Sequence, residues 1–303
     1  MLGWSYRRPP PDATSLLGMP QPLLAVDAPS LLFRAFYALP DSITDKDGKP
    51  VNALLGALNM IFRVVADYSP RAVVLCFGPD AAVYRKELYE PYHAARPPVP
   101  PELDRQFAES RAFFESFGWT VTWSEDHEAD DLLGSYAHAE EEAGGTALVL
   151  TGDRDMYQCA TDRTTILYVK TGTKGVEEVD PAEVRRRYGV TPEQVPDFIA
   201  LRGDPSDGLP GAKGIGEKTA ADLLARHGSL EAALEGWSRE SSARVRGALK
   251  DQREELERFR EIATLRTVEV ELPPDRETDF DGGREMAEAR GMKQLAGRLE
   301  RAV

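Results

Sequence analysis

Three short apolar runs divide the first half of the chain. They read PLLAV (22–26), AVVLCF (72–77) and TALVLT (146–151), and each is continuous, without alternating polar positions. This pattern is typical of strands that are buried on both faces of a sheet. Segments with helical periodicity lie between and beside these runs, at 51–68, 101–118 and 128–145. Strands that alternate with helices predict βαβ units, and therefore an α/β fold with a mostly parallel sheet.

The pattern changes after about residue 180. Short capped helices at DPAEVRRRYG and TPEQVPDFIALRG precede a glycine-rich connection, and two more helices follow it. We therefore expect an α/β domain at 21–180 and a helical domain at 181–270. The Pro-rich residues 1–20 are predicted to be a disordered extension, and residues 271–303 a linker and tail.

Composition narrows these expectations further. Hydrophobic residues make up 42% of the 303 residues, enough for a large core, and no apolar run is long enough to span a membrane. Cys76 and Cys159 lie in or beside apolar runs, which favours reduced thiols in a cytoplasmic protein. A formal net charge of -14 argues against general nucleic-acid binding, but a local basic surface remains compatible with it.

Acidic residues follow each of the apolar runs. Asp27 comes directly after the first, Asp153 and Asp155 follow the third, and Asp80 lies three residues beyond the second. Ligands of open parallel sheets bind beyond the carboxyl ends of the strands, so these acids are predicted to share one edge. Any one of them alone is more simply explained as a helix cap or loop residue. Together they favour a shared site.

The stretch EADD places further acids at the start of the helix at 128–145. Glu128 and Asp131 are i,i+3 neighbours on one helical face. Carboxylates this crowded are stabilised by a hard cation such as Mg²⁺, and a pair of such ions supports phosphoryl transfer. No cluster of His or Cys accompanies the acids, which disfavours zinc.

A second informative stretch is RGDPSDGLPGAKGIGEKTAADLL (202–224). Its glycines allow backbone N–H groups to approach a phosphate, and the following helix start adds positive potential. This is the pattern of a helix–hairpin–helix that binds a duplex backbone without reading sequence. An ordinary αα-hairpin is the alternative, and the Walker pattern is not satisfied. The expected DNA contacts are Gly211, Lys213, Gly214, Gly216, Lys218 and Thr219.

These motifs together resemble a known family. LLAVDAPSLLFRAFYALP, PVNALLGALNMI, EADDLLGSYA, LVLTGDRDMYQ and GDPSDGLPGAKGIGEKTA occur in the order found in the 5′-nuclease domain of bacterial DNA polymerase I and in bacteriophage 5′-exonucleases and flap endonucleases. The resemblance covers residues 21–270. Because no polymerase region follows, it suggests a stand-alone form.

The resemblance implies a Rossmann-like (PIN-like) nuclease domain, a helix–three-turn–helix DNA-binding subdomain and hydrolysis with two or more Mg²⁺ or Mn²⁺ ions. It also implies K⁺ at the hairpin. Carried over by motif, the implied metal ligands are Asp27, Glu128, Asp130, Asp131, Asp153, Asp155, Asp204 and Asp207.

Residues 80–103 resemble the arch that admits the 5′ strand, and we refer to them as the arch segment. Within it, Arg85 and His93 are expected to orient the scissile phosphate. Stackable rings beside cations suit a single-stranded end, although a surface segment whose tyrosines cover the core is the alternative. The expected DNA contacts here are Tyr84, Lys86, Tyr92 and Arg96.

The chain departs from the family at three positions. Gly78 stands where the family has aspartate, and Asp80 is the candidate substitute as a metal ligand. His93 stands where the family has lysine, and Gly208 where it has asparagine. The first change could weaken a metal site, and the second could make the rate depend more on pH.

The sequence therefore predicts a structure-specific 5′-nuclease that acts on DNA with a 5′ flap, a 5′ overhang or a nick, in replication or repair. No membrane association is expected. Two alternatives remain at this point. One is a non-catalytic DNA-junction binder, which only Gly78 favours. The other is a metal-dependent RNase with a related fold, which the duplex-binding hairpin disfavours.

Overall fold

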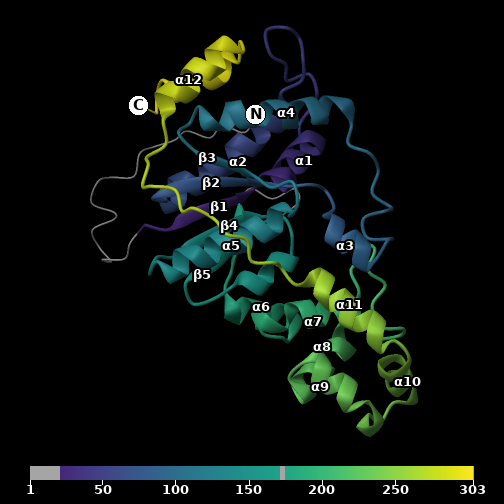
Figure 1. Cartoon of the computed structure of the whole chain (residues 1–303). Helices are drawn as coiled ribbons and strands as arrows, with labels where there is room; N and C mark the ends of the chain where they lie inside the picture. Colours follow the sequence, from purple (N-terminus) through teal and green to yellow (C-terminus); the bar gives the residue numbers. More distant parts are fainter. Residues whose placement is uncertain (1–20, 171–174, 303) are drawn as a thin grey trace.

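The computed structural model describes residues 21–170 and 175–302, so the predicted disorder of residues 1–20 lies outside the described part (Figure 1). Six strands form one sheet in the order β3-β2-β1-β4-β5-β6, and only the β5–β6 pair is antiparallel. The strands are β1 (Leu23–Asp27), β2 (Ala72–Phe77), β3 (Thr120–Trp123), β4 (Ala147–Thr151), β5 (Thr164–Val169) and β6 (Val176–Val179). The predicted α/β fold with a mostly parallel sheet is confirmed.

Helices cover both faces of the sheet because its central strands are apolar on both sides. Along β1, Leu23 and Ala25 join the core on one face, and Leu24 and Val26 join the core on the other. The second face is covered by α1 (Ala28–Ala38), α2 (Asn52–Tyr68) and α4 (Pro101–Glu115), and the first by α5 (Ala129–Glu142) (Figure 1).

The helical domain lies below the sheet in Figure 1, on the same face as α5. Its hydrophobic side chains, such as Phe198 and Leu224, belong to the same core cluster as Leu23 and Val149 of the sheet. The two parts therefore share one hydrophobic interior. The helical elements are α6 (Pro181–Tyr188), η2 (Pro192–Gln194), α7 (Val195–Arg202), α8 (Glu217–His227), α9 (Leu230–Glu235), η3 (Trp237–Arg239), α10 (Ala243–Asp251) and α11 (Arg253–Ala263).

Residues 271–302, expected to form a linker and tail, contain two helices. An extended segment after α11 crosses the molecule to α12 (Phe280–Ala289) and α13 (Lys293–Leu299) (Figure 1). Ala287, Leu295 and Leu299 are buried in the same core cluster as Phe62 and Phe117. This amphipathic pattern was overlooked because the charged residues around it resemble those of a solvated tail.

The three strands and three helices expected in the α/β domain are present, with ends that differ by a few residues. Strands β3, β5 and β6 were not predicted, because they lie toward the sheet edges and are only partly apolar. No helix in the described ranges is both long and apolar enough to cross a membrane. Both cysteines are free thiols, and Cys76 is buried.

Candidate metal and nucleic-acid site

The first acid of the site is fixed by the strand that carries it. Asp27 ends β1 and caps α1, because its Oδ1 accepts a hydrogen bond from the Ser30 backbone N–H at 3.0 Å. Its Oδ2 accepts one from the Thr151 hydroxyl at 2.6 Å. These two contacts hold the carboxylate between the carboxyl ends of the neighbouring strands β1 and β4.

The turn after β4 positions the next two acids. The Thr151 hydroxyl also accepts a hydrogen bond from the Asp153 backbone N–H at 2.9 Å. Oδ1 of Asp153 in turn accepts one from the Asp155 backbone N–H at 2.9 Å, at the start of η1 (Asp155–Cys159). The sequence TGDRD therefore folds into a turn that keeps both carboxylates at the sheet edge.

The charges of these acids oppose one another. Burial raises the pKa of Asp130 well above its ordinary value, and the charges of Asp27 and Asp153 raise it further. Burial and the charge of Asp207 raise the pKa of Asp153 to about 6. Burial and the charge of Asp153 likewise raise the pKa of Asp155 well above its ordinary value. Carboxylates from β1, α5 and the β4 turn therefore lie close enough for their charges to affect one another.

This donor set fits a divalent cation, because hard ions prefer carboxylate oxygens and would relieve the mutual repulsion. Within residues 21–170 and 175–302, however, no three Asp, Glu, His or Cys side chains already converge as ligands of one ion.

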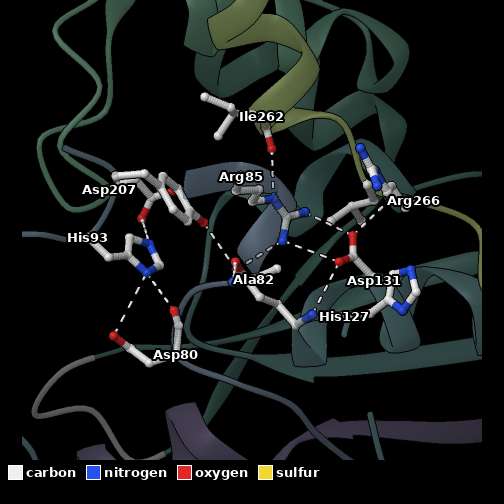
Figure 2. A network of polar contacts seen from close by, with 12 residues as sticks. Asp80, Ala82, Arg85, His93, His127, Asp131, Asp207, Ile262 and Arg266 are labelled. Carbon is white, nitrogen blue, oxygen red and sulfur yellow. Dashed lines mark hydrogen bonds and ion pairs between the residues drawn. The ribbon is translucent and has the colours of Figure 1, made fainter. Parts of the chain in front are cut away.

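Two other predicted ligands belong to a buried ion-pair network (Figure 2). Arg85, on α3 (Val83–Leu88), lies 3.0 Å from Glu128 Oε2 and 2.8 Å from Asp131 Oδ1. Its side chain is also held by the Ile262 carbonyl oxygen, which accepts its Nε–H at 3.0 Å. Burial alone would lower the pKa of Arg85, but Glu128 and Asp131 raise it, so the group stays charged.

That arrangement conflicts with the predicted role of Arg85 in contacting the scissile phosphate. Arg85 is only 2% exposed, and two carboxylates already occupy its guanidinium. Tyr92 likewise cannot stack on a base in this arrangement, because it is 3% exposed and donates its hydroxyl to Glu128. Sequence alone could not separate these residues from the exposed Lys86 and Arg96 of the same segment.

His93 and Arg96 bind the acid Asp207. Nε2 of His93 and Nη2 of Arg96 each lie 3.0 Å from Asp207 Oδ1. His93 has a left-handed backbone, with φ of 56°, and its ring stacks on Tyr92 at 3.8 Å. The contacts bring the arch segment against the turn that precedes the hairpin.

Asp80 does not take the place of the missing family aspartate. Its Oδ1 lies 2.8 Å from Arg96 Nη1, and its side chain is 56% exposed. Its backbone oxygen lies 2.5 Å from Nδ1 of His93. The Asp80 carboxylate is therefore paired with Arg96 and His93 of its own segment.

The hairpin has the geometry that its glycines predict. Gly211 and Gly214 have φ of 67° and 76°, and a Cβ at Gly211 would lie 2.3 Å from the backbone nitrogen of Gly203. Gly216 is the N-cap of α8. The exposed members of the predicted DNA-contact set are Lys213, Gly214, Gly216 and Lys218, while Thr219 is half-buried and Gly211 is buried.

The turn before the hairpin holds the remaining acid. Oδ1 of Asp204 accepts the Ser206 backbone N–H at 2.8 Å, and Oδ2 lies 3.2 Å from Arg202 Nη2. Gly208, with φ of 78°, keeps the turn tight against the Pro91 carbonyl oxygen.

Sequence reasoning missed two cations beside the acids. Arg154 and Arg202 line a cleft of about 620 Å³ together with Asp153, Asp155 and Asp204. Arg154 stacks over Tyr168 at 5.7 Å, and Arg202 over Phe198 at 5.1 Å. Their position inside the TGDRD and LRGD motifs was the available signal. Both arginines lie beside the acids in the sequence, and only the acids were assigned to the site.

Two family models together match most of the chain. The 5′-3′ exonuclease N-terminal resolvase-like domain matches residues 22–189, and the 5′-3′ exonuclease C-terminal SAM fold matches residues 190–280. The chain belongs to the 5′-3′ exonuclease family. The helices from α7 to α11 lie in the SAM-fold part. Asp27, Glu128, Asp130, Asp131, Asp153 and Asp155 lie in the resolvase-like part, and Asp204 and Asp207 in the SAM-fold part.

Curated relatives include the thermostable DNA polymerase I of Thermus thermophilus, 38% identical over 269 residues, which are 88% of this chain and 32% of that protein. DNA polymerase I of Bacillus subtilis is 35% identical over 245 residues, 81% of this chain and 28% of that protein. This 5′-3′ exonuclease chain thus spans about a third of the length of these relatives.

Solved structures of similar fold include T5 5′-exonuclease with bound zinc ions, with a TM-score of 0.67, 20% identity and coverage of 93% of this chain and 99% of that one. The catalytic core of Rad2 in complex with DNA substrate has a TM-score of 0.61 at 15% identity and covers 94% and 93% of the two chains. These likenesses show the fold that this family member shares with those nucleases.

Proposed function

We propose that this chain is a divalent-metal-dependent 5′-nuclease that hydrolyses DNA phosphodiesters at 5′ flaps, overhangs and nicks. The observation that carries the proposal is the set of mutually repelling carboxylates that β1, α5 and the β4 turn bring together, in which Asp130, Asp153 and Asp155 have raised pKa values. Clustered acids whose charges raise one another's pKa values are candidates for metal ligands.

The resident groups would divide the work as follows. Asp27, Asp130, Asp153 and Asp155 would hold Mg²⁺ or Mn²⁺ ions, which supply an activated water and stabilise the leaving oxygen in reactions of this class. In hydrolysis, water oxygen forms a bond to phosphorus as the phosphorus–O3′ bond breaks, which leaves a 3′-hydroxyl and a 5′-phosphate. The exposed cations Lys86 and Arg96 would screen the strand as it enters the arch segment.

Duplex binding would fall to the hairpin. Lys213, Lys218 and the N-terminus of α8 are exposed on the helical domain, and they offer charge and backbone N–H groups to phosphates. Contacts of this kind depend on the shape of the duplex and not on its sequence, which suits an enzyme that selects junctions.

K⁺ is a candidate ion at the hairpin turns. A cytoplasmic location would suit both the substrate and the free thiols.

A 5′-flap oligonucleotide with Mg²⁺ or Mn²⁺ tests the proposal. We expect cleavage near the junction by the wild-type chain and a loss of at least about 100-fold in Asp130→Asn, since a ligand would be removed. Binding of the uncut flap in Ca²⁺ should persist in this variant. Binding without cleavage by the wild-type chain would favour the junction binder, and preferential cleavage of an RNA flap would favour the RNase.

A further inference from the structure

Asp130 and Asp131 are adjacent in sequence but lie in different environments. Successive residues of a helix point about 100° apart, so the two carboxylates of α5 leave the helix in different directions. Asp131 is 0% exposed and part of a dense hydrogen-bond network (Figure 2). In the described ranges, no hydrogen bond or ion pair is formed by the Asp130 carboxylate, which instead experiences the charges of Asp27 and Asp153.

Five donors occupy the Asp131 carboxylate. Oδ1 accepts Nη2–H of Arg85 at 2.8 Å and the backbone N–H of Arg266 at 2.9 Å. Oδ2 accepts the Tyr84 hydroxyl at 2.9 Å, Nη1–H of Arg85 at 3.2 Å and the Glu128 backbone N–H at 3.2 Å. A carboxylate has about four lone-pair sites, so none remains for a metal ion.

The donors come from three separate parts of the molecule. Tyr84 and Arg85 lie on α3 of the arch segment, Glu128 is the N-cap of α5, which also carries Asp131, and Arg266 follows α11 of the helical domain. Arg85 strengthens the connection through its contact with the Ile262 carbonyl oxygen. The Arg266 guanidinium closes the network by stacking over the Tyr84 ring at 3.4 Å.

A second contact connects the same three-way junction one helical turn further on. The Ser135 hydroxyl donates to the Asp131 backbone oxygen at 2.6 Å and accepts the Val268 backbone N–H at 2.8 Å. The segment after α11 is therefore fixed to α5 at two successive points. Releasing the Asp131 carboxylate to a metal would leave the buried Arg85 with fewer counter-charges and would remove one of these two points, the Arg266 N–H contact.

We infer that Asp131 is a positioning residue and not a metal ligand, and that its network with Arg85 fixes α5 relative to the arch segment and the helical domain. Asp130 is then the residue through which α5 contributes to the metal site. The network sets where Asp130 lies by holding the helix that carries it. The catalytic consequence rests on the proposed nuclease function, whereas the assignment of the two aspartates does not.

Mn²⁺ binding to the full chain, followed by the EPR signal of free Mn²⁺, tests this assignment independently of any activity. We expect Asp130→Asn to weaken the tightest Mn²⁺ site at least tenfold with little change in Tm. Asp131→Asn should keep the number of ions and their affinity within about twofold while its Tm falls by several degrees. Loss of an ion in Asp131→Asn would overturn the inference, and so would a wild-type chain that binds no Mn²⁺.

A second variant keeps the test decisive should Asp131→Asn fail to fold. The Arg85→Gln, Asp131→Asn double variant removes two of the three buried charges together. The remaining Glu128 carboxylate keeps its hydrogen bonds from the Ala82 backbone N–H and the Tyr92 hydroxyl. This protein should retain its Mn²⁺ sites, and their loss would contradict the assignment. In flap cleavage, folded variants of the network should show a lower kcat with KM nearly unchanged. Absence of cleavage by the wild-type chain would sink the proposed function and leave the Mn²⁺ result standing.

Discussion

An ideal Cβ at Gly78 would lie 2.3 Å from the backbone oxygen of His127 and 2.8 Å from the backbone nitrogen of Ala129. The start of α5 thus occupies the space that a side chain at residue 78 would need. An aspartate at residue 78 would therefore require a change elsewhere in the site, because backbone atoms of residues 127–129 occupy the space of its side chain.

Restoring the family residue should therefore damage the protein. We expect Gly78→Asp to lower the free energy of unfolding by about 1–3 kcal/mol, since backbone atoms must move to admit the side chain. Gly78→Ala, which adds no carboxylate, should show a similar loss by thermal unfolding. A Gly78→Asp protein with an unchanged Tm and faster flap cleavage would show that the position still accepts a ligand.

The raised pKa of Asp153 predicts an unusual dependence of stability on pH. Because the folded-state pKa is raised from 3.8 to about 6, ionisation of Asp153 opposes folding. Its contribution to stability is lost as pH rises from about 4 through 6, and the cost above that range is on the order of 3 kcal/mol. In EDTA at pH 8, Asp153→Asn should therefore melt at a higher temperature than the wild type.

That difference should disappear near pH 4, where the wild-type carboxyl is protonated. Mg²⁺ should raise the wild-type Tm more at pH 8 than at pH 5, because it binds the ionised acids. Asp222→Asn, at an exposed position of α8, is the matched control. Equal Tm values for wild type and Asp153→Asn at pH 8 would contradict the electrostatic account.

The two hairpin lysines should act through phosphate charge. Lys213→Ala and Lys218→Ala should each weaken duplex binding several-fold and reduce the slope of log K against log salt by about 0.9. Fluorescence anisotropy with a blunt duplex in Ca²⁺ at several salt concentrations measures both effects. Lys293→Ala, on the opposite face of the sheet, should leave the slope unchanged. An unchanged slope in both hairpin variants would place the duplex elsewhere.

The C-terminal helices should be part of the folded core. Leu295 is 2% exposed, so Leu295→Ala should lower the free energy of unfolding by about 2–4 kcal/mol through lost packing and a residual cavity. Lys293→Ala, at an exposed position on the same helix, should change it by less than about 0.5 kcal/mol. Chemical denaturation of the two variants compares them directly. A mild effect of Leu295→Ala would mean that α13 unfolds separately.

Asp80 should be dispensable for metal binding. Its carboxylate pairs with Arg96 at an exposed position, and such pairs contribute only about 0–1 kcal/mol. Asp80→Asn should leave Mn²⁺ affinity unchanged, in contrast to Asp130→Asn. A weaker Mn²⁺ site in Asp80→Asn would return Asp80 to the ligand set.

Local sequence determined much of this protein. Continuous apolar runs can be satisfied only by strands buried on both faces, so β1, β2, β4 and the helices between them were predictable. Acids at the ends of those strands meet at one edge because parallel strands end together, which is why Asp27 and Asp153 could be assigned to one site. The glycines of the hairpin likewise permit left-handed turns, which Gly211 and Gly214 adopt.

Tertiary structure decided which charged residues face that site. Asp130 and Asp131 have the same chemistry and adjacent positions, yet contacts from distant segments, such as the Arg266 N–H 135 residues away, give them different environments. The arch segment also combines exposed cations with a buried one, and its sequence pattern does not tell them apart. Whether a charged side chain is buried or paired depends on segments that are distant along the chain. It is therefore decided only in the folded molecule.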